Sequence, residues 1–391
     1  MQAWTVEVGC AHGLESIVEA ETRSILATCR RADSPESAAE DAIALRVKPG
    51  RIGVEATLSE AYALNLLLAT AERVCLQIDD FRVRHLAEFS RFLKKASLES
   101  WFCTRPTIRV RSKRSKLYHT GALADRLHAA LERIGEAEAV QPSGDGVSAA
   151  EGDPPPALLE AEIVDDRCRL YVDLSGQPLH RRGYRLAQTK APLREDLAAA
   201  LLAVSGWDGS APLFDPFCGA GTIPIEAARR STGVPPGWNR RFAFETLADF
   251  DARSWAEIRA VYAPKPGDVS RVSIYASDRD AGAISATLEN AQRAGIQSQL
   301  QVEHAALSSA SAWNSKEPLV VVTDPPHGRR LGKGKDLRPV YQRLGDRIQQ
   351  SSAALTFLVG SAQQARLTAL ELRQVFNSRS GGAKVVAYVG R

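Results

Sequence analysis

Leu213–Arg230, LFDPFCGAGTIPIEAARR, is the stretch of sequence that decides the fold. A short apolar strand ends at Phe214, two glycines then let the backbone turn sharply and approach a ligand, and a helix follows. This order of strand, glycine turn and helix predicts a loop that binds a nucleotide-type cofactor; a strand-to-helix corner without a ligand is the alternative. The candidate cofactor-binding residues of the loop are Asp215, Gly219, Gly221 and Thr222.

The loop does not match the dinucleotide-binding pattern. No third glycine follows at the G-x-G-x-x-G spacing, and the next strand-end acid, Asp278, lies far beyond the roughly 20 residues that the pattern expects. Asp278 still ends an expected strand, where a carboxylate can accept hydrogen bonds from ribose hydroxyls. An exposed turn acid without a ligand is the alternative for this residue.

Strand-like and helix-like segments alternate through the C-terminal half of the chain. Strands are expected at 212–214, 273–276, 319–322 and 354–359, and helices at 195–204, 222–230, 281–294 and 340–352. Such alternation predicts an open α/β sheet whose ligand lies at the carboxyl ends of the strands.

A second motif, VVVTDPPHGRRLG at 320–332, ends another apolar strand. Two prolines fix the backbone, so that the preceding carbonyl groups and the Asp324 carboxylate point at one place. Methylation of an exocyclic base nitrogen needs such acceptors, because they turn the nitrogen lone pair towards a sulfonium methyl. We expect His327 to stack on a base flipped out of its helix; a plain turn is the alternative for the motif taken alone. The candidate catalytic residues are Asp324, Pro325, Pro326 and His327.

The N-terminal half has α+β character and an uneven distribution of charge. Between Arg82 and Arg133 thirteen Lys or Arg accompany four Asp or Glu. Clustered cations neutralise phosphates and neighbouring aromatic rings stack on unpaired bases, so this region predicts RNA binding; a solvated face is the alternative. The candidate RNA-binding residues are Arg109, Arg111, Lys113, Arg114, Lys116, Tyr118 and His119, with Arg181 and Arg182, which are either RNA contacts or linker residues, at the domain junction.

Length and composition exclude several classes of protein. The 391 residues exceed one ordinary domain, no apolar run approaches the roughly 18 residues of a membrane span, and the N-terminus has no basic leader. The six cysteines include no C-x-x-C pair, and none lies at zinc-ligand spacing from a histidine. We therefore expect a cytoplasmic protein with no membrane segment, no disulfide and no metal.

Five motifs, taken in order, carry a resemblance to a known family. They are HRRGYRLAQTKAPLREDLAAALL, DPFCGAGTIPIEAA, RRFAFETLADFDARSW, ASDRDAGAISATLENAQRAGI and TDPPHGRRLG. Together they resemble the THUMP-domain RNA methyltransferases that make N2-methylguanosine in tRNA or large-subunit rRNA, many of which have been labelled adenine-specific DNA methylases. The segments GLESIVEAE and SKRSKLYHTGALADRLHAAL resemble the N-terminal portions of that family, so the likeness covers nearly the whole chain.

The resemblance implies an α/β fold with a Rossmann-like class I methyltransferase sheet at the C-terminus. It divides the chain into a ferredoxin-like module at 1–70, a THUMP RNA-binding domain at 71–177 with a flexible insertion at 141–156, and a methyltransferase domain at 178–391. S-adenosylmethionine is the implied cofactor and RNA the implied partner. The residues that match the family's cofactor site are Pro192, Leu193, Arg194, Glu195, Asp215, Cys218, Gly219, Gly221, Thr222 and Asp278, and Asp324 to His327 match its catalytic tetrad [N/D]-P-P-[Y/F].

The chain departs from the family pattern at two positions. The tetrad ends in His327, whose ring offers less stacking area and a charge that depends on pH. After the third strand, where the family has an acid near the adenine, this chain has His304. The expected function is methyl transfer to a guanosine N2 in tRNA or rRNA; the alternatives are an adenine N6 methyltransferase acting on DNA and a non-catalytic RNA-binding protein with a degenerate methyltransferase fold.

Overall fold

The computed structural model describes residues 2–33, 43–132, 134, 152–186, 193–264, 272–327 and 336–391. Pro192 and residues 141–151 of the expected insertion lie outside these ranges. The chain forms two compact units: unit 1 comprises Met1–Cys10, Glu19–Leu179 and Asn239–Val261, and unit 2 comprises Ala11–Val18, His180–Trp238 and Tyr262–Arg391.

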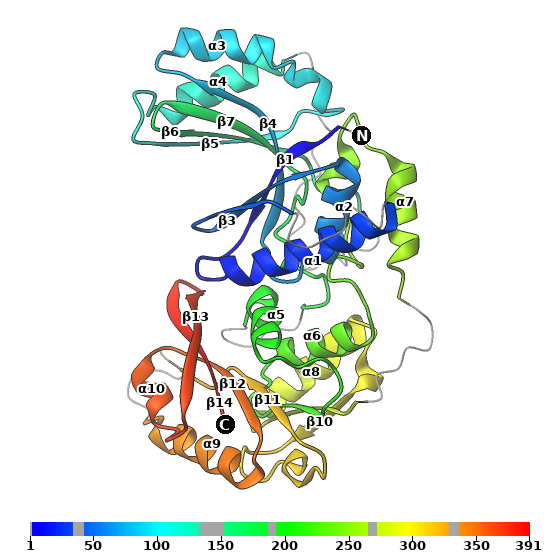
Figure 1. Cartoon of the computed structure of the whole chain (residues 1–391), viewed down its shortest axis with the longest axis vertical. Helices are drawn as coiled ribbons and strands as arrows, with labels where there is room; N and C mark the ends of the chain where they lie inside the picture. Colours follow the sequence, from blue (N-terminus) through cyan, green and yellow to red (C-terminus); the bar gives the residue numbers. More distant parts are fainter. Residues whose placement is uncertain are drawn as a thin grey trace. The chain divides into compact units, whose positions relative to one another are not determined.

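Unit 1 is built on a sheet that has seven strands among the described residues, in the order β2-β3-β1-β4-β7-β6-β5. All neighbouring strands are antiparallel except β5 and β6, which are parallel. Helices α3 and α4 lie side by side, and α4 packs on β5 (Figure 1). The strands are β1 Trp4–Gly9, β2 Leu45–Lys48, β3 Arg51–Ala56, β4 Arg73–Arg82, β5 Thr107–Lys113, β6 Leu158–Val164 and β7 Arg167–Asp173, and the helices are α1 Glu15–Asp33, α2 Leu58–Leu67, α3 Leu86–Lys95, α4 Thr120–Ala130 and α7 Ala252–Val261.

The structure divides the chain differently from the expected domains at residue 70 and at residues 239–261. Strand β1 pairs with β4, so residues on both sides of position 70 belong to one sheet. Residues 239–261, expected in the methyltransferase domain, cluster with unit 1 because their aromatic rings pack there. The rings of Tyr62 and Phe244 stack with centroids 4.2 Å apart, and Phe244 meets Trp255 edge-on at 5.1 Å.

Unit 2 contains the open α/β sheet that the sequence predicted. Its order among the described strands is β10-β9-β8-β11-β12-β14-β13; the first five strands are parallel, and β14 and β13 are antiparallel to their neighbours. The strands are β8 Leu213–Asp215, β9 Ile274–Asp278, β10 Leu300–His304, β11 Val320–Thr323, β12 Ala354–Val359, β13 Leu372–Ser380 and β14 Ala383–Gly390, and the helices are α5 Glu195–Val204, α6 Thr222–Ser231, α8 Ala281–Arg293, α9 Arg338–Ser351 and α10 Ala362–Arg366.

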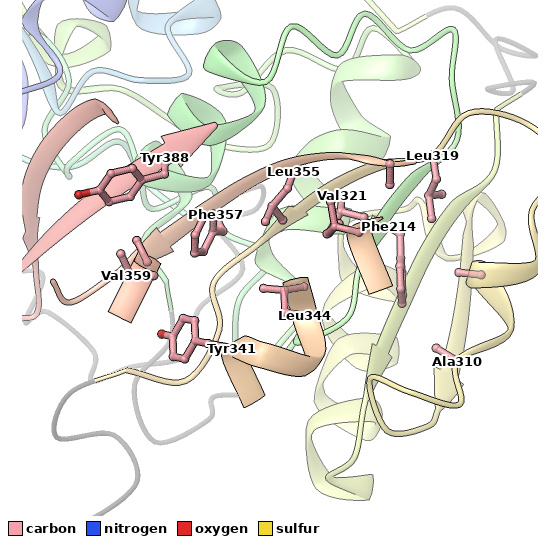
Figure 2. Close-up of a cluster of buried hydrophobic side chains, with 14 of the residues drawn as sticks. Phe214, Ala310, Leu319, Val321, Tyr341, Leu344, Leu355, Phe357, Val359 and Tyr388 are labelled. Atoms are coloured by element: carbon pink, nitrogen blue, oxygen red, sulfur yellow. The ribbon is translucent and has the colours of Figure 1, made fainter. Parts of the chain in front are cut away.

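A buried cluster holds the central strands of unit 2 in register. Phe214 of β8, Val321 of β11 and Phe357 of β12 pack against Tyr341 and Leu344 of α9 (Figure 2). Burial of each such side chain stabilises the fold by roughly 1.5–3 kcal/mol. The cluster therefore fixes β8 beside β11, at the point where the strand order reverses and α/β sheets bind their ligands.

None of the helices in the described part of the chain combines the length and the apolar composition needed to cross a membrane. Within the same residues, no group of three His, Cys, Asp or Glu side chains is arranged to hold a metal ion.

Candidate functional site

Asp215, the last residue of β8, lies between the ends of two neighbouring strands. Its side chain is 1 % exposed and accepts hydrogen bonds from Thr323 Oγ1 at 2.6 Å and from the backbone N–H of Phe217 at 3.1 Å. Thr323 ends β11 and directly precedes Asp324, so one hydrogen bond joins the glycine turn to the proline corner.

Burial raises the pKa of Asp215 to about 7. The hydrogen bonds from Thr323 and Phe217 oppose this shift, whereas the nearby charges of Asp324 and Asp278 add to it. The three carboxyl groups share one edge of the sheet because β9, β8 and β11 are parallel neighbours and each carries its acid at or directly after its carboxyl end.

Asp278 holds the glycine turn against the end of β9. Its carboxylate accepts hydrogen bonds from the backbone N–H groups of Gly219 at 3.1 Å and Asp280 at 3.0 Å. The backbone N–H of Cys218 donates to the carbonyl of Ser277 at 3.0 Å. The sequence suggested a ribose-binding role for Asp278, and the structure adds a role in fixing the loop.

Two polar side chains of α8, missed by sequence reasoning, support the same turn. Thr287 Oγ1 donates to the Gly219 carbonyl at 2.9 Å, and Asn290 Nδ2 donates to the Ala220 carbonyl at 3.0 Å. Gly221 has φ +82°, and a Cβ at this position would lie 2.8 Å from Thr287 Cγ2. Glycine is therefore required here by both backbone conformation and packing. The available signal was a pair of polar residues on the inward face of an amphipathic helix.

Cys218 is a packing residue of the turn. Its thiol is buried, lies 3.6 Å from Thr287 Oγ1, and has a pKa raised by burial. Because the thiolate is the reactive form, these surroundings do not suit a nucleophile.

The segment 193–195 lies against the start of α6. Thr222 Oγ1 donates to the Leu193 carbonyl at 3.4 Å, and Arg185 donates to the same carbonyl at 2.7 Å. Arg185 also contacts Glu195 at 3.1 Å, and burial raises the pKa of Glu195 to about 7 despite this positive neighbour. Arg194 turns to Asp196 instead. Leu193 is thus placed beside the start of α6. The role of Leu193, Arg194 and Glu195 in cofactor binding, which the resemblance implied, stays a prediction.

The proline corner carries Asp324 and His327 in close contact. Nδ1 of His327 lies 3.2 Å from Asp324 Oδ1 and 3.0 Å from the Pro325 carbonyl oxygen. Tyr341 of α9 donates its hydroxyl to the Pro326 carbonyl at 3.2 Å. The His327 ring is 4 % exposed, so little of it is open to solvent, and its expected stacking on a base stays a prediction. His304, at the end of β10, is exposed and has Nε2 3.1 Å from the Arg279 carbonyl.

The carboxyl groups and the glycine turn at this sheet edge fit S-adenosylmethionine. The cofactor carries a sulfonium and an ammonium, and the carboxyl groups of Asp215, Asp278 and Asp324 meet at one sheet edge. A glycine turn followed by a helix lets backbone N–H groups approach a bound molecule closely.

The basic residues expected to bind RNA lie on β5, at one end of the unit 1 sheet, and in the loop after it. Lys113 and Lys116 are exposed, and Tyr118 is 67 % exposed with its ring 4.0 Å from that of His119. Arg109 and Arg111 lie 3.4 and 3.3 Å from Glu160, and Arg114 pairs with Asp165 at 2.8 Å. The acids partly neutralise the arginines, which leaves the lysines as the stronger candidates for phosphate contacts.

Arg181 and Arg182, predicted together as RNA contacts, have different environments. Arg181 is exposed, whereas Arg182 is 1 % exposed, with its guanidinium 3.4 Å from Glu226. Tyr184 donates its hydroxyl to the same glutamate at 2.9 Å. The prediction for Arg182 is wrong, because a buried and paired guanidinium cannot reach a phosphate.

The chain is similar to known methyltransferases. The family described as "RMKL-like, methyltransferase domain" matches residues 182–386. "Putative RNA methyltransferase slr0064" from Synechocystis is 29% identical over 373 residues, which are 92% of this chain and 93% of that protein. "Ribosomal RNA large subunit methyltransferase K/L" from Aliivibrio fischeri is 32% identical over 350 residues; the match covers 86% of this chain but only 48% of that relative.

The fold also matches solved structures. The crystal structure of SMU.472, "a putative methyltransferase complexed with SAH", superposes on this chain with a TM-score of 0.80 at 22% sequence identity. The match covers 100% of this chain and 98% of SMU.472. The likeness shows that the sheet of unit 2 has the class I methyltransferase fold, as the sequence predicted.

Proposed function

Because the chain belongs to the family of RMKL-like methyltransferase domains, whose cofactor is S-adenosylmethionine, we propose that it methylates the exocyclic N2 of a guanosine in tRNA or large-subunit rRNA. Membership in the family rests on a match over residues 182–386 of the 391-residue chain. The names of its relatives favour RNA as the substrate.

One observation carries the proposal: the Thr323 hydroxyl donates to Asp215 at 2.6 Å, so the glycine turn and the proline corner adjoin. A molecule held over the turn can then present a reactive group to the corner. Had the two loops lain at opposite edges of the sheet, no single small molecule would have touched both.

The residues have separate roles in the proposed reaction. Asp215, Asp278 and the backbone of the glycine turn hold the cofactor, which supplies an electrophilic methyl group on sulfur. Asp324 accepts an N–H of the target amino group and so turns its lone pair towards the methyl. Formation of the nitrogen–carbon bond would break the sulfur–methyl bond and leave its electrons on sulfur, as S-adenosylhomocysteine. Asp324 would then serve as an acceptor for the proton that the nitrogen loses.

Unit 1 supplies the proposed contacts to RNA. The exposed lysines of β5 and the following loop offer phosphate contacts, and Tyr118 offers a surface for an unpaired base. Such contacts position nucleic acid without reading its sequence, so the choice of base falls to the residues at the strand ends of unit 2.

Substitution of Asp324 tests the catalytic assignment. We expect Asp324→Ala to lower methyl transfer from radiolabelled S-adenosylmethionine by at least about 100-fold, while calorimetry shows nearly unchanged cofactor affinity. Asp324→Asn is the matched control, since it keeps one acceptor oxygen and should retain at least about a tenth of the activity. Wild-type rates in Asp324→Ala would refute the assignment.

Competition between tRNA, rRNA fragments and duplex DNA, followed by mass spectrometry of the nucleosides, tests the substrate. We expect N2-methylguanosine in RNA. N6-methyladenine in DNA would establish the first alternative, and no saturable heat with S-adenosylmethionine would establish a non-catalytic RNA-binding protein.

A further inference from the structure

The imidazole of His327 has a fixed hydrogen-bonding environment. Nδ1 faces two oxygen acceptors, the Pro325 carbonyl at 3.0 Å and Asp324 Oδ1 at 3.2 Å. A ring nitrogen between two acceptors carries a hydrogen, so the neutral ring is assigned the Nδ1–H tautomer. Nδ1–H therefore donates to the Pro325 carbonyl and lies 3.2 Å from Oδ1 of the Asp324 carboxylate.

The corner that holds this pair is rigid. Pro325 and Pro326 fix the backbone between the two side chains, and the Tyr341 hydroxyl anchors the Pro326 carbonyl to α9. A Cβ built at Gly360, just after β12, would lie 3.6 Å from His327 Cδ2, so the ring packs close to that backbone. Asp324 and His327 are 8 % and 4 % exposed at their side chains. A buried donor on a rigid support restricts the rotamers of the carboxylate it faces.

We propose that His327 is a positioning residue that acts through Asp324, and not a stacking platform for the target base. The Nδ1–H edge of the ring, 3.2 Å from Oδ1 of Asp324, attracts that oxygen and so directs Oδ2 to accept from the amino group of the substrate. This inference rests on the proposed role of Asp324 in methyl transfer. Orientation of the acceptor sets the lone pair of the nucleophile, so loss of the Nδ1 donor lowers kcat and leaves binding of the nucleic acid nearly unchanged.

Two substitutions separate positioning from stacking. His327→Phe keeps an aromatic face and removes the donor, whereas His327→Asn removes the ring and places an amide nitrogen close to the position of Nδ1. We expect kcat to fall roughly 10- to 100-fold in His327→Phe with KM for the nucleic acid within about threefold of wild type. We expect His327→Asn to recover most of that loss. Steady-state kinetics on whichever nucleic acid the wild-type protein methylates provides both constants.

Wild-type kcat in His327→Phe, or a raised KM with unchanged kcat in His327→Asn, would show stacking and overturn the proposal. An equal loss of kcat in both variants, at unchanged thermal midpoint and cofactor affinity, overturns it as well, because the donor would then not be the property that matters.

A measurement without turnover keeps this test separate from the proposed function. Long-range ¹H–¹⁵N correlation spectra of the full chain, labelled at histidine, report the tautomer of each ring, and His327→Phe assigns the His327 signals. We expect the hydrogen of the His327 ring on Nδ1 in the wild-type protein. The Nε2–H form would overturn the positioning role of His327, even if methyl transfer to RNA were established. If the chain fails to methylate RNA, the proposed function fails, whereas the spectrum still reports the tautomer of His327.

Discussion

The two sheets of this protein have similar sizes but use their polar residues differently. In unit 2 the parallel strands β9, β8 and β11 end at one edge, where Asp278, Asp215 and Asp324 converge in a largely buried site. In unit 1 the mostly antiparallel sheet ends at β5, whose cations lie in solvent beside Glu160 and Asp165.

The difference shows how strand order determines what a charged residue can do. Parallel strands whose order reverses beside β8 bring loops from distant parts of the sequence to one place. An edge strand brings only its own side chains, and charges there also prevent edge-to-edge association. We therefore expect substitutions inside unit 2 to change stability and catalysis, and those at the unit 1 edge to change only the affinity for nucleic acid.

The largest expected effect is a loss of stability when the buried ion pair between Arg182 and Glu226 of α6 is removed. Arg182→Ala leaves Glu226 of α6 buried next to an empty site, which costs about 3–5 kcal/mol. Arg181→Ala is the adjacent control and should cost about 0.5 kcal/mol or less, because that side chain is exposed. Urea unfolding measures both; similar stabilities would contradict the burial of Arg182.

The next largest effect is a pH-dependent change in stability that arises from protonation of Asp215. The folded state raises the pKa of this carboxyl from 3.8 to about 7 and so binds its proton more tightly than the unfolded chain. Its contribution to stability is present below pH 3.8 and is lost as the pH rises through about 7. Asp215→Asn should therefore stabilise the cofactor-free protein by about 2 kcal/mol more at pH 8 than at pH 5. Unfolding at the two pH values measures this difference, and a pH-independent effect would contradict it.

Substitution in the glycine turn should cause a smaller loss of stability and also weaken cofactor binding. Gly221→Ala forces φ +82° on a residue with a Cβ and moves Thr287, at a cost of about 1–2 kcal/mol. We expect calorimetry to show weaker S-adenosylmethionine binding. Gly233→Ala, which has φ +67° but open space around the Cβ, is the control for backbone strain alone and should leave cofactor binding unchanged.

The smallest effect is expected at the edge of unit 1. Lys113→Gln with Lys116→Gln should weaken RNA binding roughly threefold to tenfold, and should lower the slope of log K against log salt by about 1 for each lost phosphate contact. Lys48→Gln on β2, at the other edge of the same sheet, is the matched control. Equal effects in the two variants would mean that β5 is an ordinary solvated edge.

Local sequence patterns predicted much of unit 2. Helix α5 begins and ends as expected at Glu195 and Val204, and β12 covers the expected 354–359. The resemblance to the methyltransferase family is confirmed, and so is the fold. Roles in cofactor and RNA binding stay predictions. The carboxyl ends of β8, β9 and β11 were recognisable because an acid follows each apolar run within two residues.

What the sequence did not predict depends on contacts between distant residues. The hairpin of β13 and β14 went unrecognised because β13, LRQVFNSRS, alternates exposed polar residues with few apolar ones. The roles of Thr287 and Asn290 depend on where α8 meets the glycine turn, about 70 residues earlier in the chain. Arg182 was misassigned because its partner, Glu226, lies 44 residues away.

The aromatic segment 239–261 has a consequence for synthesis. A nascent chain is made from its N-terminus, and domains generally fold as soon as they are complete. Phe244 and Trp255 belong to unit 1 but follow β8 and α6 of unit 2 in the sequence. Translation must therefore reach Val261 before the core of unit 1 can close. The first unit to begin is therefore not finished when the ribosome starts on the second, and cutting the gene at residue 177 would separate Tyr62 from the rings that cover it.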